Sequence, residues 1–236
     1  MKKNLVYFAA LLIVLLGTAG CEKQSLGLTK TTFYADIQLD GGSQMVVAKG
    51  STFVDPGFTA VMAGQDVTDK VEVTGEVDTS KSGVYTVTYG IVNADGFPAS
   101  VTRTVIVLDL ADAVEGFWQV DNSVSTRDYS GTLAPFKGPF RFLIIGEGEG
   151  NYHVEDLLAG WYAQGAGYGA DYAMDSEISI ADDGTITLLK SSVPGWGDSA
   201  DYLKDGKFDA ATSTITYKVG YAGKMEFDVT LNKVEL

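Results

Sequence analysis

The chain has 236 residues, 45% of them hydrophobic, and its 31 acidic residues outnumber 17 basic ones, which gives a formal net charge of −14 at pH 7. An acidic chain without a basic cluster repels nucleic acid and anionic lipid headgroups, so we expect no nucleic-acid partner. One cysteine, Cys21, and one histidine, His153, are too few for a disulfide or a zinc site.

The N-terminus has the order of a secretory signal peptide. Lys2 and Lys3 precede an apolar run over residues 5–16, and small residues then lead to Cys21. The apolar run is shorter than the about 20 residues that cross a bilayer. We therefore predict a signal peptide over residues 1–20.

Cys21 at this boundary resembles the lipobox of bacterial lipoproteins, although Thr18 stands where Leu is usual. The resemblance implies cleavage before Cys21 and a lipid on its thiol that attaches the protein to the membrane. The alternative is an ordinary signal peptide that leaves a free thiol. We expect a lipid-anchored protein of the bacterial outer membrane. Surface lipoproteins of Bacteroidetes often carry an acidic run after the cysteine, and only Glu22 stands there, so the periplasmic and surface-exposed faces both stay open.

A tether and a first β domain follow. Residues 21–32 are polar and aperiodic, which is typical of a flexible tether. Within residues 33–109, the segments 84–89 and 101–107 alternate β-branched or aromatic residues with a period of two. Several short strands within about 75 residues predict a β-sandwich. Turn signals separate the runs at residues 41–42, 55–57 and 93–96.

Residues 50–60 (GSTFVDPGFTA), followed by residues 64–68, 83–89 and 103–107, resemble the Ig-like surface domains of secreted and lipid-anchored bacterial proteins. The resemblance implies a spacer or protein-binding module without shared catalytic residues. A fold of this kind does not determine the function.

Residues 110–115 are predicted to be an acidic linker, and residues 116–236 a second domain rich in Gly, Tyr and Trp. Apolar residues alternate on both sides of Gly184, and again on both sides of residues 220–223, which predicts antiparallel hairpins. Helical periodicity is scarce, with room for a turn or two at residues 154–158.

The second domain begins with Gly116-Phe117-Trp118 and ends in a meander, and in this it resembles the lipocalin-like barrels of Bacteroidetes lipoproteins. A β-sandwich is the alternative for this half. The whole arrangement resembles lipoproteins that accompany polysaccharide-utilisation loci. The predicted fold class is all-β, with an N-terminal Ig-like β-sandwich followed by a second antiparallel β domain.

Aromatic residues gather in two Gly-rich segments of the second domain, which we expect to be loops. Exposed rings stack on the apolar face of a pyranose, while carboxylates accept hydrogen bonds from its hydroxyls. The alternative is that the two tryptophans of these segments plug the ends of the barrel as core residues. The candidate ligand-binding residues are Trp161, Tyr162, Tyr168, Tyr172, Trp196, Asp198 and Tyr202.

Catalysis is disfavoured. His153 lies in an expected strand, where a hydrogen-bonded structural histidine is the commoner case. The pairs Asp182–Asp183 and Asp198–Asp201 offer oxygen ligands for calcium but lack EF-hand spacing. Phosphate-binding and dinucleotide-binding motifs are missing from the sequence. We expect no catalytic residue, no metal and no cofactor.

The sequence therefore predicts a monomeric, non-catalytic binding or accessory protein whose partner is a glycan or an outer-membrane protein. Two alternatives stay open. One is a structural or adhesive surface protein that binds other proteins. The other is a carrier that holds a small ligand inside a lipocalin-like barrel.

Overall fold

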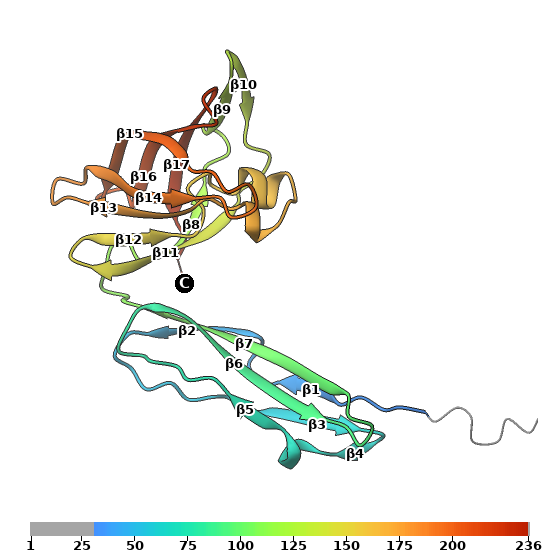
Figure 1. The fold of residues 1–236 in the computed structure, drawn as a ribbon. Helices are drawn as coiled ribbons and strands as arrows, with labels where there is room; N and C mark the ends of the chain where they lie inside the picture. The colour runs from blue at the N-terminus through green and yellow to red at the C-terminus, as the bar shows by residue number, and fades with distance from the viewer. Residues whose placement is uncertain (1–30, 236) are drawn as a thin grey trace, which may run out of the picture.

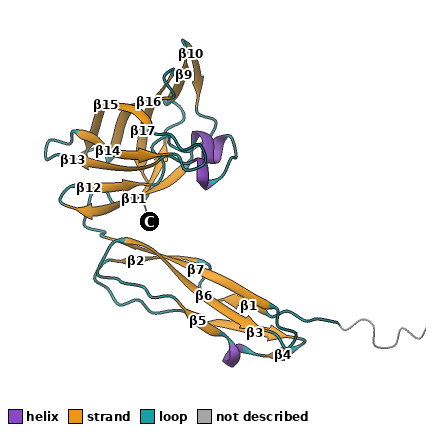
Figure 2. Cartoon of the chain, viewed as in Figure 1, coloured by secondary structure: helices purple, strands orange, loops and turns teal. Residues whose placement is uncertain are grey.

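The computed structural model describes residues 31–235. This part of the chain is built almost entirely of strands and forms two β domains in succession (Figures 1 and 2). The all-β prediction is confirmed. The predicted signal peptide and Cys21 lie outside the described residues. No helix within residues 31–235 combines the length and the apolar character needed to cross a membrane.

Two sheets form the first domain. One sheet has the order β1 (Asp36–Leu39), β3 (Phe58–Met62) and β4 (Gln65–Asp66), and a short 3-10 turn, η1 (Thr68–Lys70), follows it. The other has the order β2 (Gln44–Ala48), β7 (Pro98–Leu108), β6 (Gly83–Val92) and β5 (Glu72–Thr74). β2 runs parallel to β7, whereas β6 is antiparallel to both of its neighbours. Alternate residues of β6, Val87, Tyr89 and Ile91, enter the core, as the period of two predicts.

Arg103 is completely buried in the first domain and ties two of the predicted turns together. Its guanidinium donates to the backbone oxygens of Asp40 at 2.8 Å, Gly42 at 2.7 Å and Gly57 at 2.9 Å. The same group forms an ion pair with Asp55 at 3.4 Å. Because a buried charge is destabilising unless it is paired and hydrogen-bonded, this network holds the two turns in place.

The second domain is a partly closed, antiparallel barrel rather than a sandwich. Hydrogen bonds connect the strands in the order β14, β13, β12, β11, β8, β17, β16 and β15. A single bridge between Thr185 and Lys207 closes the remaining gap between β14 and β15. The bounds are β8 (Gly116–Val120), β11 (Arg141–Gly148), β12 (Asn151–Val154), β13 (Asp175–Ile180), β14 (Ile186–Ser192), β15 (Ala200–Asp209), β16 (Thr214–Tyr221) and β17 (Met225–Lys233).

Two additions project from this barrel. β9 (Thr126–Tyr129) pairs with the first half of β17. The hairpin that β9 forms with β10 (Thr132–Pro135) protrudes beyond the other strands (Figure 1). A π-helical turn, η2 (Trp161–Gly165), and a 3-10 turn, η3 (Ala170–Tyr172), lie beside this hairpin (Figure 2). The helical turn expected at residues 154–158 was misplaced, because β12 extends to Val154 and the first helical element of the second domain begins only at Trp161.

Side chains fill the barrel interior. Trp118, Tyr217 and Phe227 are buried there among aliphatic residues from all around the wall. Trp118 donates from its indole nitrogen to the Val114 oxygen at 2.7 Å, and Tyr217 donates its hydroxyl to the Leu157 oxygen at 2.9 Å. The polar ends of these large rings are therefore satisfied within a packed core. This interior has the character of a core and not of a ligand cavity, so the small-ligand carrier gains no support.

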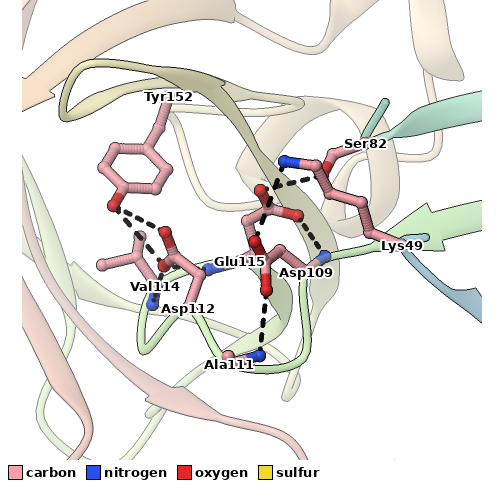
Figure 3. Close-up of polar contacts among 8 residues, drawn as sticks. All are labelled: Lys49, Ser82, Asp109, Ala111, Asp112, Val114, Glu115 and Tyr152. Carbon is pink, nitrogen blue, oxygen red and sulfur yellow. Dashed lines mark hydrogen bonds and ion pairs between the residues drawn. The ribbon is translucent and has the colours of Figure 1, made fainter. Parts of the chain in front are cut away.

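The two domains meet at a small junction centred on Glu115 (Figure 3). Glu115 is only 5% exposed and accepts hydrogen bonds from the Ser82 hydroxyl at 2.9 Å and from the Asp109 amide at 2.8 Å. Lys49 forms an ion pair with Asp109 at 3.7 Å. An apolar cluster drawn from both domains lies at the same junction and comprises Ile106, Leu108, Phe117, Leu143 and Ile145.

Candidate functional site

Five aromatic residues from separate segments of the second domain meet beside the helical turns. Trp196, in the loop between β14 and β15, lies at the centre and is 42% exposed. The ring centroid of Trp196 lies 4.8 Å from that of Tyr162 and 4.9 Å from that of Tyr172. Tyr168 and Tyr221 lie within 6.2 Å by the same measure. We call these five residues the aromatic platform.

The rings of the platform differ in orientation and exposure. Tyr162 and Tyr168 are stacked, with an interplanar angle of 13°, whereas Trp196 meets both nearly edge-on at 89° and 90°. Tyr168 is 55% exposed, and Tyr221 is buried. The platform thus presents Trp196 and Tyr168 to solvent on a base of more buried rings, which is the form of a rigid aromatic surface.

Glycine allows these rings to approach one another. Any Cβ at Gly195 would lie 2.6 Å from an atom of the Tyr172 ring, so only glycine lets Tyr172 lie flat against this part of the loop. Gly160 has a φ of +81°, and a Cβ there would also collide with Phe140. The Gly-rich composition that predicted loops therefore serves close aromatic packing.

Asp156 fixes the segment that carries Tyr162. Its buried carboxylate accepts hydrogen bonds from the backbone amides of Leu158 at 2.9 Å, Gly160 at 3.0 Å and Met174 at 3.0 Å. Burial raises the pKa of Asp156 to about 6, although the three amides oppose that shift. One side chain thus joins the start of η2 to Met174, the residue just before β13.

Asp198 lies at the edge of the platform. Its carboxylate accepts a hydrogen bond from the Tyr221 hydroxyl at 2.7 Å. Burial raises the pKa of Tyr221 strongly, and the hydrogen bond to Asp198 raises it further. The side chain of Asp198 remains exposed, so it keeps acceptor capacity beside Trp196.

Trp161 and Tyr202 lie outside the platform. Trp161 is half-buried and meets Phe136 edge-on at 4.9 Å and Phe227 at 5.7 Å between ring centroids, so the core-plug alternative describes it best. Tyr202 lies on β15 and donates its hydroxyl to Glu226 at 2.6 Å. Of the seven candidate residues, the structure brings together Tyr162, Tyr168, Tyr172, Trp196 and Asp198.

Other polar side chains of the second domain pair with one another or with the backbone. His153, on β12, hydrogen-bonds Asp175 at 2.8 Å on the barrel wall, in the structural role expected for it. Asp183 accepts from the amide of Thr185 within the predicted turn. No group of three or more His, Cys, Asp or Glu side chains suited to a metal occurs within residues 31–235.

Each of the two domains matches a known protein family. Residues 37–107 match the family described as "Bacterial surface protein, Ig-like domain", and residues 108–233 match the C-terminal domain of BT2262-like proteins. The crystal structure of the lipoprotein BT2262 from Bacteroides thetaiotaomicron is 38% identical to this chain. It aligns over 85% of this chain and 100% of that chain, with a TM-score of 0.72. The chain belongs to the BT2262-like family.

The predicted resemblance to lipoproteins of Bacteroidetes with a bacterial Ig-like domain is thereby confirmed. Two structures of Clostridium perfringens ZmpB also align, at 14% and 15% identity, over 86% and 85% of this chain and 44% and 21% of those chains. Their TM-scores of 0.27 and 0.28 are too low to carry an argument. A search of curated proteins gave no match.

Three residues at or beside the site were not anticipated from the sequence. The sequence predicts a turn at residues 220–223, but β16 continues to Tyr221, and the Tyr221 ring lies 6.2 Å from that of Trp196 between centroids. Asp156 carried no recognisable signal, because its three amide partners lie up to 18 residues away. Arg127 lies over the Trp161 ring, 4.7 Å from its centroid. It gave no signal in the sequence, because it belongs to a short polar strand.

Proposed function

We propose that this protein is a lipid-anchored, extracytoplasmic and non-catalytic protein that binds glycans through the aromatic platform. The observation that carries this proposal is the position of Trp196, 42% exposed and held against four tyrosines. Contiguous exposed apolar patches on a protein surface often mark a binding site. A rigid ring surface binds with little loss of conformational entropy, because its side chains are already ordered.

The chemistry of the platform suits a sugar ring. Pyranoses present an apolar face of C–H groups that packs against aromatic faces and edges. Asp198 stands beside Trp196 as a hydrogen-bond acceptor for sugar hydroxyls, and the Tyr168 hydroxyl adds a group that both donates and accepts. The open surface favours a segment of a polysaccharide over a fully enclosed small molecule.

The proposed anchoring rests on Cys21 and on the family. BT2262 is described as a lipoprotein, and Cys21 of this chain follows a signal-peptide pattern. Attachment in the outer membrane, with the Ig-like domain holding the barrel away from the lipid, is the arrangement we propose. The Ig-like domain precedes the barrel in the chain and therefore lies between Cys21 and the platform.

Affinity electrophoresis of the purified protein on a panel of polysaccharides tests the proposal. We expect retardation on at least one glycan, and loss of it in Trp196→Ala and Tyr168→Ala. Phe97→Ala removes a comparably exposed ring, 47% accessible, from the first domain and serves as the matched control. If no glycan retards the protein, or if the platform variants migrate like the wild type, the proposal is wrong.

A second function is favoured by the protruding β9–β10 hairpin. Leu133 is 68% exposed and Tyr129 40% exposed at this hairpin, while Val124 just before it is 59% exposed. Apolar groups clustered on a projecting hairpin suit contact with another surface protein. Cross-linking in whole cells that depends on Leu133 and not on Trp196 would support this adhesive role.

A further inference from the structure

Arg127 is the least satisfied charged side chain near the platform. It belongs to β9, and its Nε atom is buried without a hydrogen-bond partner. Its guanidinium carbon lies 4.7 Å from the Trp161 ring centroid and 5.6 Å from that of Tyr129. A guanidinium carries five N–H donors, and stacking on rings uses none of them. The rings therefore orient the group without using its N–H donors.

Two lysines share this environment. The ammonium of Lys224 lies 5.5 Å from the Tyr129 ring centroid, so two cations contact one exposed ring. Lys137 lines a shallow apolar groove together with Trp161 and Phe140. None of the ion pairs within residues 31–235 involves Arg127, Lys137 or Lys224.

Neighbouring carboxylates are engaged with other donors. Asp128 accepts from the Gly131 amide, and Asp201 accepts from the Gly223 amide. Glu226 forms an ion pair with Lys204 at 2.6 Å and accepts the Tyr202 hydroxyl. Arg127, Lys137 and Lys224 thus lie around the rings of Trp161 and Tyr129 without a carboxylate partner in any ion pair of residues 31–235. This arrangement leaves room for an anion from a bound ligand.

This cationic group is continuous with the platform. Trp161 and Tyr162 are adjacent in η2, and the Tyr162 hydroxyl interacts with the Arg127 guanidinium. The Tyr162 ring also contacts Trp196, with 4.8 Å between the ring centroids. A saccharide lying on Trp196 can therefore direct a neighbouring sugar unit toward Arg127.

We propose that the site binds an acidic saccharide, with Arg127 and Lys224 pairing with a carboxylate or sulfate group of a sugar ring next to the one on Trp196. This inference rests on the proposed glycan-binding function and narrows its ligand class. Arginine is well suited to such a group, because its planar fork donates two parallel hydrogen bonds to one anion. Pairing in a partly dry aromatic surround strengthens that interaction.

Titration calorimetry with oligogalacturonate, its fully methyl-esterified form, neutral galactan and sulfated galactan tests this inference. Oligogalacturonate and its ester share a backbone and differ only at the carboxyl group, which the methyl ester makes neutral. We expect the wild type to bind one of the two acidic saccharides at least about tenfold more tightly than its neutral counterpart. Which acidic saccharide is preferred distinguishes a carboxylate from a sulfate ligand.

Variants show which cation is responsible for the preference for acidic saccharides. Arg127→Gln is expected to abolish the preference, Lys224→Ala to reduce it, and Arg127→Lys to retain part of it. Arg141→Gln removes the same charge from an exposed arginine that donates its Nε–H to Gln119, and it is expected to leave the preference intact. Lys224→Ala also keeps the test decisive if Arg127→Gln disturbs the fold, because Lys224 is exposed.

The outcomes separate the two proposals. Equal binding of neutral and acidic saccharides, unchanged in Arg127→Gln, would overturn the acidic-ligand inference and leave glycan binding intact. Equally tight binding of polyglutamate would also overturn it, because charge without a sugar would then be sufficient. Binding of no saccharide at all would overturn both proposals.

Discussion

The carboxylate of Glu115 accepts a hydrogen bond from the Ser82 hydroxyl at 2.9 Å, so the segment that joins the domains is tied back to the first of them. The same carboxylate accepts the Asp109 amide, and the adjacent apolar cluster draws residues from both domains. Together these contacts fix the second domain against the Ig-like domain at this junction.

Replacement of Glu115 should loosen this junction. Glu115→Ala removes two charge-assisted hydrogen bonds from a buried position, and we expect the free energy of unfolding to fall by roughly 1–3 kcal/mol. Small-angle scattering should show a wider distribution of distances between the domains. Glu76→Ala, at an exposed position of the first domain, is the control. Unchanged scattering and stability in Glu115→Ala would show that the apolar cluster alone fixes the junction.

The platform should be sensitive to a single methyl group. In Gly195→Ala, the new Cβ would lie 2.6 Å from the Tyr172 ring, and the ring must move. We expect glycan binding to weaken while the circular dichroism spectrum stays that of the wild type. Gly90→Ala is a suitable control, because its Cβ would meet its nearest neighbour at an ordinary 3.9 Å. Normal affinity in Gly195→Ala would mean that Tyr172 is not needed for binding.

Trp118 and Trp196 should respond in opposite ways to truncation. Trp118 is completely buried, so Trp118→Ala is expected to cost about 3–5 kcal/mol of stability. Trp196 is 42% exposed, and its replacement by Ala is expected to change stability far less and to act on binding. Chemical denaturation and affinity electrophoresis of the two variants distinguish these roles. A large loss of stability in Trp196→Ala would assign Trp196 to the core.

Local patterns predicted the strands well, because the alternation of apolar and polar residues that marks a strand is visible within a few residues. Ile178 pairs with Leu188 and Ile180 with Ile186, as the alternation around Gly184 predicted. The choice between barrel and sandwich depended on which distant strands pair, notably β8 with β17, and alternation carries no information about that. Clustering of aromatic residues pointed to the platform, but it could not separate exposed Trp196 from half-buried Trp161, because burial depends on the packed fold.

The buried carboxylate of Asp156 should make stability depend on pH. Burial raises the pKa of Asp156 to about 6 from 3.8, so between these values the folded state holds a proton that the unfolded state has released. Its contribution to stability is therefore present in full below pH 4 and is lost as pH rises through about 6. We expect the difference in unfolding free energy between wild type and Asp156→Asn to change by about 3 kcal/mol across this range. A pH-independent difference would show that the three amides offset the effect of burial, so that the pKa of Asp156 is the same in the folded and unfolded states.

If the protein is lipid-anchored, its attachment to the membrane should depend on the sulfur atom of Cys21. If the Cys21 thiol carries a diacylglyceryl group, the protein should sediment with membranes and incorporate labelled palmitate. Cys21→Ser should abolish both. Two or more acyl chains contribute about 0.8 kcal/mol per buried CH₂, which makes the attachment effectively permanent. A chain that begins at Thr29 should be soluble, and its folding should be indifferent to dithiothreitol, because Cys21 is the one cysteine of the sequence. A Cys21→Ser protein that stays in the membrane fraction would instead identify the apolar run before Cys21 as an uncleaved anchor.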